Sequence, residues 1–302
     1  MKTIVIHHSA DFDGLFCREI ARKFRPEAEL IGWDYGQPKI PFDPEATTYV
    51  LDLSPECLGG DTYDSSKLVW IDHHKSAIEK FPTTIPGYRI DGVAACRLTW
   101  QWFAYTEGYH QQNFALPGKG LFTDRVVIEP PAVRLAGEYD VWDKRNPDVD
   151  AFQLGLRSRK LTEHDWTLLL DSHGSRSATV LLDTLLDNGR LLQEYVNERD
   201  KAQVENLGFL VEFAGLKFLA LNSAGKGSMQ FAAKDIPETG HDALLKFNWT
   251  GVHWDISLYH AKHRTDLDLS LIAAKYGGGG HRGACGFRIG NLPGPATLPF
   301  NQ

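Results

Sequence analysis

Three short apolar runs in the first quarter of the chain each lead directly into acidic or imidazole side chains. The runs cover residues 3–6, 48–51 and 67–71, and each has the length of a buried strand. The polar side chains that follow them are His7, Asp11 and Asp13, then Asp52, and then Asp72, His73 and His74. Open α/β sheets bind ligands where the carboxyl ends of parallel strands meet. If the runs are parallel strands of one sheet, these side chains converge at that edge.

Apolar positions at helical spacing alternate with these runs. After the first run, Leu15, Phe16, Ile20 and Phe24 fall near one stripe of a helix. A further strand is predicted at residues 30–33 and a helix at 92–105. This alternation favours a mostly parallel sheet with helices on both faces. We therefore predict an α/β domain over residues 1–190.

The second half of the chain follows a different pattern. An amphipathic stretch at residues 177–207 is interrupted by Asn188 and Gly189, which predicts a break in the helix. The other predicted elements are two helices around an acidic turn within 130–159, strands at 209–221 and 243–260, the latter folded at 249–251, a helix at 267–276 and a strand at 284–287. We predict a helical connector at 191–206 and a smaller C-terminal α/β domain at 207–302.

The composition is that of an ordinary globular protein. Of the 302 residues, 42% are hydrophobic and 24% are charged, which is enough for a buried core in each domain. The formal net charge of -7 argues against binding to long nucleic acid through a general positive field. A short anionic substrate bound at a local site is compatible with this charge.

No membrane span or disulfide framework is visible in the sequence. The four cysteines are widely separated and form no C-x-x-C pair. No uninterrupted apolar stretch reaches the roughly 20 residues that a bilayer span needs, and no leader pattern precedes the first run. We expect a cytoplasmic protein that does not bind membranes.

The acids after the first two runs have the arrangement that a pair of divalent cations needs. Asp11 and Asp13 are two residues apart, so both carboxylates can turn inward around a tight loop, and Asp52 on a second strand is the candidate to bridge two ions. Metal ions roughly 3.5–4 Å apart clamp the oxygens of an in-line phosphoryl displacement. The imidazole of the first strand comes from His7 or His8, which point to opposite faces of a strand. We favour His7.

The third run and a later acidic turn supply the rest of the site. Asp72 is expected to anchor the strand end, while one imidazole of His73 and His74 binds metal and the other contacts a substrate phosphate or the leaving group. The remaining carboxylate comes from Asp140 or Asp143. We favour Asp140 because its aromatic neighbours predict a half-buried position, whereas Asp143 precedes two basic residues. Carboxylate and imidazole ligands suit Mn, Mg, Fe(II) or Zn.

Four consecutive glycines stand near the carboxyl end, at residues 277–280, and His281 follows them. The backbone N–H groups of such a run can approach an anion closely because no side chain intervenes. A strand of small residues comes next, which a flexible linker would not need. We therefore predict that Gly278, Gly279, Gly280 and His281 bind substrate.

These motifs resemble those of the DHH phosphoesterases. Asp72, His73 and His74 match the motif after which that superfamily is named, and residues 277–287 are similar to the Gly-Gly-Gly-His signature of its associated C-terminal domain. The resemblance covers nearly the whole chain. It implies a Mn-dependent two-metal hydrolase with its site in the cleft between two domains. The turn at residues 140–142 resembles the nano-RNase, or oligoribonuclease-like, branch more than the pyrophosphatase branch.

The resemblance also implies roles for single residues. The ligands of one metal would be His7, Asp11 and Asp52, and those of the other would be Asp13, Asp52, His73 and Asp140. His74 would contact the scissile phosphate, beside Asp72 and His73 in the catalytic set. His281 and the glycine loop would bind the far phosphate or the nucleotide of the substrate.

The chain departs from the family in the strand before the glycine loop. Members that bind nucleotides often carry an Arg-Ser pair there, where this chain has Tyr259 and His260. Lys262, His263 and Arg264 are the candidates to supply the missing positive charge. The alternation along the strand makes Tyr259 the candidate to stack on a base.

The leading hypothesis is a phosphodiesterase with two Mn²⁺ ions that hydrolyses short oligonucleotides or linear dinucleotides to mononucleotides, with Mg²⁺ or another divalent cation as the alternative metal. A second hypothesis is a phosphatase that acts on 3′-phosphoadenosine 5′-phosphate, polyphosphate or cyclic nucleotides. A third is a catalytically silent nucleotide sensor, against which the complete ligand set argues. The sequence leaves open the direction of cleavage and whether two chains form a homodimer.

Overall fold

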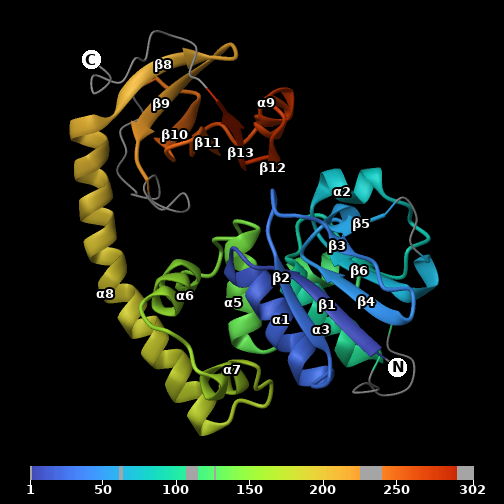
Figure 1. Ribbon diagram of the computed structural model, residues 1–302. Helices are drawn as coiled ribbons and strands as arrows, with labels where there is room; N and C mark the ends of the chain where they lie inside the picture. Colours follow the sequence, from blue (N-terminus) through green and yellow to red (C-terminus); the bar gives the residue numbers. More distant parts are fainter. Residues whose placement is uncertain (1, 61–63, 107–114, 126, 225–239, 291–302) are drawn as a thin grey trace. The chain divides into compact units, whose positions relative to one another are not determined.

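The computed structural model describes residues 2–60, 64–106, 115–125, 127–224 and 240–290. The chain divides into two compact units, Met1–Gln193 and Glu194–Gln302, each built around its own sheet. Figure 1 shows the elements of both.

The first unit contains a five-stranded sheet in the order β2-β1-β4-β6-β7. Its strands are β1 (Lys2–His8), β2 (Glu29–Trp33), β4 (Ala46–Leu51), β6 (Leu68–Asp72) and β7 (Gly87–Arg89). Every neighbouring pair is parallel. The carboxyl ends of the three predicted runs therefore lie at the same edge, which confirms the predicted parallel α/β sheet.

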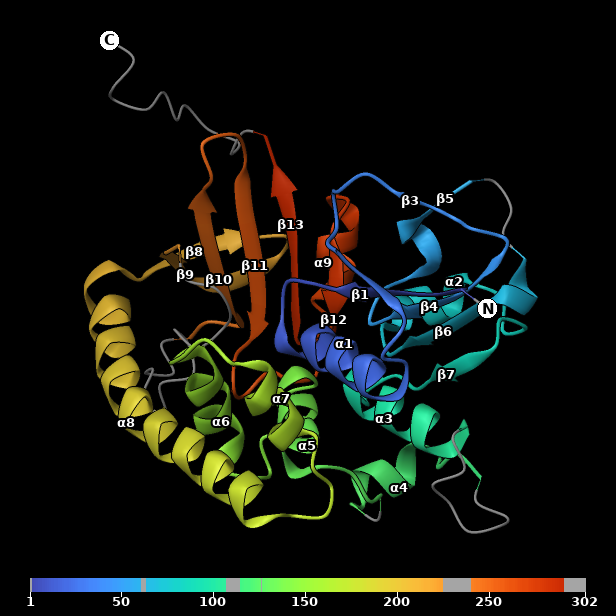
Figure 2. The ribbon, with the colours of Figure 1, turned by 60° about the horizontal axis from the view of Figure 1, so that its bottom comes forward.

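Helices cover both faces of this sheet (Figure 2). The helices of this unit are α1 (Phe12–Phe24), α2 (Lys75–Lys80), α3 (Ala95–Thr106), α4 (Lys119–Thr123), α5 (Pro131–Asp140), α6 (Asp148–Arg157), α7 (Glu163–Leu169) and the first part of α8 (Arg176–Leu207), which continues into the second unit. Short pieces complete the unit: β3 (Ile40–Pro41), β5 (Leu58–Gly59) and single turns at Pro55–Cys57 and Ser65–Lys67. On one face Val5 and Leu51 share a core with Phe16 of α1, and on the other Ile6 shares one with Ala77 of α2.

The predicted break in the amphipathic stretch is wrong, because α8 runs without interruption through Asn188 and Gly189. A Cβ at Gly189 would lie 1.7 Å from the carbonyl oxygen of Ala151 on α6, and a Cβ at Gly155 of α6 would lie 2.0 Å from the carbonyl oxygen of Leu185. The two helix backbones touch where each has a glycine. Gly189 therefore allows close packing and does not end the helix.

The second unit contains a six-stranded sheet in the order β12-β13-β11-β10-β9-β8. Its elements are β8 (Phe209–Phe213), β9 (Leu216–Asn222), β10 (Ala243–Trp249), β11 (Trp254–His260), α9 (Ser270–Lys275), β12 (Gly279–His281) and β13 (Ala284–Ile289). All pairs are antiparallel except β9 with β10. The chain reverses direction near residues 249–251, as predicted, in the turn between β10 and β11.

Each face of the second sheet has an apolar cluster. Ile256 and Leu258 of β11 pack on one side with Ile272 of α9, whereas Tyr259 packs on the other side with Val204 of α8. The four cysteines of the chain are all buried and unbridged. Among the described helices, none is long and apolar enough to cross a bilayer.

Candidate metal centre

The first acidic loop is held against the end of β1. Asp11 immediately precedes α1, and its side chain accepts a hydrogen bond from the backbone nitrogen of Gly14 at 3.0 Å. A Cβ at Gly14 would lie 2.1 Å from the carbonyl oxygen of His8, so a larger residue would push the helix away from the strand. The glycine of the Asp-x-Asp-Gly motif thus brings both acids close to the edge of the sheet.

Asp13 is fixed by a second helix. Its two carboxylate oxygens accept hydrogen bonds from the backbone nitrogens of Ala95, at 2.9 Å, and Cys96, at 2.7 Å, where α3 begins. The amino end of a helix favours a negative charge. Burial nevertheless raises the pKa of Asp13, and the charges of Asp52 and Asp140 raise it further. The backbone nitrogens therefore fix the position of the carboxylate, but its surroundings disfavour its charged form.

The structure brings His8, and not His7, to these acids. His8 Nδ1 lies 2.9 Å from Asp11 Oδ2 and 3.4 Å from Asp52 Oδ2. The His7 ring instead donates from Nδ1 to the carbonyl oxygen of His8 at 2.8 Å and lies against Gly32 of β2. Burial lowers the pKa of His7 to about 4. Our preference for His7 thus disagrees with the geometry, because neighbours on β1 face opposite sides of the sheet.

Asp52 occupies the centre of the cluster. It is 2% exposed, and its backbone has the left-handed angle φ 57°, which is unusual for a residue with a side chain. Its nitrogen donates to the carbonyl oxygen of Ile71 at 2.9 Å, so β6 holds the strained turn in place. Burial would raise the pKa of Asp52, but hydrogen bonds from His73 and His8 outweigh it and hold the pKa well below its usual range.

His73 touches three carboxylates from three elements. Its Nε2 lies 3.3 Å from Asp52 Oδ1, 3.3 Å from Asp140 Oδ2 and 3.5 Å from Asp13 Oδ2. Burial lowers the pKa of this imidazole, but these acids together raise it well above its usual value. The charged ring therefore occupies a position where several acids require a cation.

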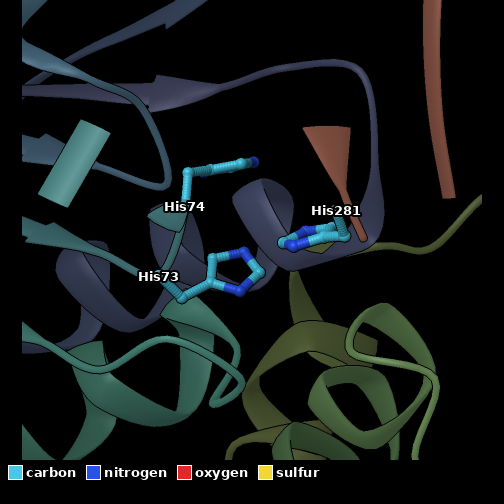
Figure 3. A group of neighbouring side chains, drawn as sticks. All are labelled: His73, His74 and His281. Carbon is cyan, nitrogen blue, oxygen red and sulfur yellow. The ribbon is translucent and has the colours of Figure 1, made fainter. Parts of the chain in front are cut away.

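Asp72 orients the second imidazole of the motif. One of its oxygens accepts from the backbone nitrogens of His73, at 2.7 Å, and His74, at 3.2 Å, and lies 2.7 Å from His74 Nδ1. Figure 3 shows the rings of His73 and His74 on the segment after β6, and their centroids are 4.7 Å apart. Burial lowers the pKa of His74, and the hydrogen bond to Asp72 more than compensates. His74 is thus a hydrogen-bond donor with a fixed orientation.

Asp140, the last residue of α5, is the later carboxylate that reaches the cluster. Its pKa is raised to about 6, chiefly by burial. Asp143 is instead paired with Arg145, at 2.8 and 2.7 Å, on the exposed surface. The structure therefore brings Asp140, and not Asp143, to the cluster, whereas the side chains of the two acids are similarly exposed.

Three overlapping sets of described side chains in the first unit could hold a cation; one of them contains Asp52, Asp72, His73 and His74, and the other two are the sets that the sequence analysis singled out as metal ligands apart from the choice of His8. His8, Asp11 and Asp52 form one set, and Asp13, His73 and Asp140 form the other; within each, the ligand atoms lie within 4.8 Å of one another. The contact between His73 and Asp52 joins the sets. Buried acids with raised pKa values beside protonated imidazoles show that the cluster carries excess negative charge. Two divalent cations with oxygen and nitrogen ligands fit this donor set.

Sequence reasoning missed Asp34 and Tyr35, which follow β2 at the same edge of the sheet. Asp34 Oδ1 lies 3.4 Å from His8 Nε2, and the Tyr35 ring lies 6.0 Å from the His8 ring between centroids. The strand before them was predicted at residues 30–33. A search for polar side chains directly after this strand, as after the other three, could have found them.

Close packing of the backbone explains why Gly278 and Gly280 of the second unit carry no side chain. A Cβ at Gly278 would lie 2.0 Å from the carbonyl oxygen of Gly286, and one at Gly280 would lie 2.7 Å from Cys285 Cα. Residues 279–281 form the edge strand β12 and not the loop that we expected. Gly279 faces open space, and the half-buried His281 ends the strand. Binding of substrate by this segment stays a prediction.

Tyr259 and Arg264 are less suited to the substrate roles that we expected. Tyr259 is 8% exposed in the apolar cluster below α8, so it has no open ring face for a base. Arg264 pairs with Asp242 and, at 3.0 Å, with Asp266, which already balance its charge. Stacking by Tyr259 stays a prediction, which the apolar cover on the second face of the sheet disfavours.

At the level of sequence, the chain is distantly similar to a curated viral protein. No protein-family model matches it. Uncharacterized protein R106 of Acanthamoeba polyphaga mimivirus is 21% identical over 250 residues, which are 79% of this chain and 51% of that protein. The chain thus spans about half the length of this curated relative.

Solved structures are similar over most of the chain. The pGpG-specific phosphodiesterase PggH from Vibrio cholerae is 14% identical with a TM-score of 0.47, over 96% of this chain and 94% of that one. The DHH domain of PF0399, a member of a family of ribosomal proteins, is 13% identical with a TM-score of 0.49, over 94% and 82%. The exonuclease RecJ bound to manganese is 13% identical with a TM-score of 0.45, over 95% and 86%.

These identities and TM-scores are low, so the assignment of a function has to come from the residues of this chain. The motif at residues 72–74 resembles that of the DHH proteins. This resemblance rests on the sequence of the chain, and the oligoribonuclease-like branch stays a prediction.

Proposed function

We propose that this protein is a metal-dependent phosphodiesterase that hydrolyses short oligonucleotides or linear dinucleotides to mononucleotides. One observation carries the proposal: two adjacent sets of carboxylate and imidazole ligands, joined through Asp52 and His73, lie at the carboxyl edge of a parallel sheet. Two Mn²⁺ or Mg²⁺ ions held there would neutralise the charge of a phosphodiester and lower the pKa of the attacking water.

The residues of the chain have separate tasks in this reaction. Asp11 and Asp13 stay in place because a backbone nitrogen of α1 binds the first, and two backbone nitrogens of α3 bind the second. Asp72 holds Nδ1 of His74, so Nε2 is the atom of that ring that donates to the phosphate or gives a proton to the leaving oxygen. The raised pKa of His74 favours the protonated form of this donor.

The charge of the protein favours a short substrate. With a formal net charge of -7, the chain has no general positive field along which a long strand would lie. A dinucleotide needs only a local site for its single phosphodiester and its ends. The buried acids, once neutralised by cations, supply such a site.

The test is to incubate the full metal-depleted chain with Mn²⁺ and a panel of labelled substrates. The panel contains dinucleotides, 3′-phosphoadenosine 5′-phosphate, a cyclic dinucleotide and polyphosphate, and the products are separated by chromatography. Mononucleotides from the dinucleotides are the expected result. Free phosphate alone would support the phosphatase hypothesis instead, and no product would support the sensor.

A pair of variants makes this test specific to the site. Asp140→Asn removes a carboxylate that touches His73, whereas Asp143→Asn removes a nearby carboxylate that touches only Arg145 among the described residues. We expect Asp140→Asn to lose most of its activity and Asp143→Asn to keep it. Equal effects of the two variants would contradict the assignment of Asp140.

A further inference from the structure

Tyr35 is an exposed aromatic residue beside the metal centre. Its ring lies 6.0 Å from the ring of His8 and 5.3 Å from the ring of Trp33, in both cases edge to face. The residue is 45% exposed, although Trp33 and Ser54, which it contacts, are buried. Large aromatic groups usually lose solvent contact when they pack at a polar edge. This one keeps open surface next to His8.

The order of the strands places the ring across the end of β1. Tyr35 follows β2, and its hydroxyl group is hydrogen-bonded to Ser54, which follows β4. In the sheet, β1 lies between β2 and β4. A side chain that starts beyond one strand and bonds beyond the other must pass over the end of the strand between them. That end is His8, whose Nδ1 touches Asp11 and Asp52.

The ring is also held in one position. The hydroxyl bond to Ser54 fixes its far end, and the edge-to-face contacts with Trp33 and His8 fix its sides. With these contacts in place, the residue still keeps almost half of its surface exposed. A fixed aromatic face at the border of a phosphate-binding site can stack on any base, because every base has a π-face.

We propose that Tyr35 stacks on the base of the nucleotide next to the scissile phosphate. The proposal rests on the phosphodiesterase function proposed above and specifies its substrate as one with a base at that position. It replaces Tyr259 as the stacking residue and places the contact within the first unit. Tyr35 thereby selects nucleotides over phosphate esters without a base.

The test compares a dinucleotide with the same dinucleotide in which one base or the other is replaced by an abasic sugar. For the wild-type protein, loss of the base at one of the two positions should raise KM by about tenfold or more. In Tyr35→Ala, KM for the intact dinucleotide should rise by a similar factor, and removal of that base should have no further effect. Tyr35→Phe keeps the ring but loses the bond to Ser54, so it should keep the dependence of KM on the base, with a smaller rise in KM than in Tyr35→Ala.

Two controls separate stacking from a structural role. Tyr105 is 43% exposed at the far end of α3, about 15 Å along the helix from Asp13's partners, so Tyr105→Ala should leave KM unchanged for all substrates. The Mn²⁺ affinity of Tyr35→Ala should equal that of the wild type. If Tyr35→Ala loses the same factor with intact and abasic substrates, the ring only supports His8 and the proposal is overturned.

The same experiment distinguishes this proposal from the one on which it rests. If the wild-type protein does not cleave the intact dinucleotide, the phosphodiesterase function fails, and the role of Tyr35 fails with it. If the wild type cleaves the dinucleotide but shows no preference for a base at either position, only the role of Tyr35 is overturned.

Discussion

The two units place their polar side chains in contrasting ways. In the first, acids and imidazoles from β1, α1, α5 and the segments after β4 and β6 meet at one edge, where burial and neighbouring acids raise the pKa of Asp13. In the second, the polar residues that we expected to act are already matched: Arg264 pairs with two acids, and Gly278 and Gly280 are packed against β13. Packing and ion pairing account for these residues of the second unit, but they do not account for the acids and imidazoles of the first.

Strand direction explains much of this difference. In a parallel sheet all carboxyl ends lie at one edge, so loops that are distant in the sequence come together. In a mostly antiparallel sheet the ends alternate between two edges, and His253 and His281, for example, lie near opposite ends of the β11 and β13 ladder. The first unit is therefore the natural place for the chemistry.

The contrast between the two units predicts its largest loss of activity at Asp52. Asp52→Asn removes the carboxylate that joins both ligand sets, so kcat should fall by at least about a thousandfold. The matched control is Asp43→Asn, because Asp43 lies before β4 and Asp52 lies after it. Steady-state hydrolysis of a labelled dinucleotide measures both variants. Wild-type turnover in Asp52→Asn would rule out the central role of this edge.

A smaller loss is expected at Asp72. Asp72→Asn leaves the metal ligands in place but weakens the partner that orients His74 and raises its pKa. We expect kcat to fall by about a hundredfold, as for loss of a positioned proton donor, with little change in KM. Mn²⁺ titration should give the wild-type affinity. A loss of metal with unchanged kcat at saturation would assign Asp72 to the metal instead.

Substitution of Asp34 tests whether the metal centre includes a residue that follows β2. Asp34 contacts His8 Nε2, on the opposite side of the ring from Asp11. Partners of this kind fix the orientation of a metal ligand, so Asp34→Asn should weaken Mn²⁺ binding by about tenfold. Asp64→Asn, at an exposed acid before β6, is the control that should bind as the wild type does. Equal affinities in all three proteins would remove Asp34 from the site.

The smallest effect is expected in the second unit. If His281 binds substrate, His281→Ala should raise KM by about fivefold, the size of one lost hydrogen bond, with kcat little changed. His253→Ala, at the turn between β10 and β11, should leave KM unchanged. An unchanged KM for His281→Ala would confine substrate binding to the first unit and make the contrast between the units complete.

The strand ends of the first unit could be predicted because their apolar runs are short and each stops at a charged residue. Asp11, Asp13 and Asp52 lie at the edge of the sheet where that reasoning put them. The choice between His7 and His8 could not be made, since neighbours on β1 face opposite sides of the sheet. Which side meets the acids is decided by tertiary contacts, and a sequence pattern does not show them.

Packing between elements also decided the environment of two other residues, Gly189 and Tyr259. Gly189 has the sequence pattern of a helix break, yet it marks a close contact between α8 and α6. Tyr259 was correctly placed on the face of β11 opposite Leu258, but α8 covers that face as well. In each case the local pattern was right, and the packing partner decided what the residue does.

The most direct test is to count the metal ions that the first unit's acids bind. Equilibrium dialysis of the metal-depleted full chain against Mn²⁺ should give two ions per chain, and Asp52→Asn should lose both while Asp43→Asn keeps them. A chain that binds no Mn²⁺, or an Asp52→Asn variant that still binds two ions, would contradict the account of a two-metal site.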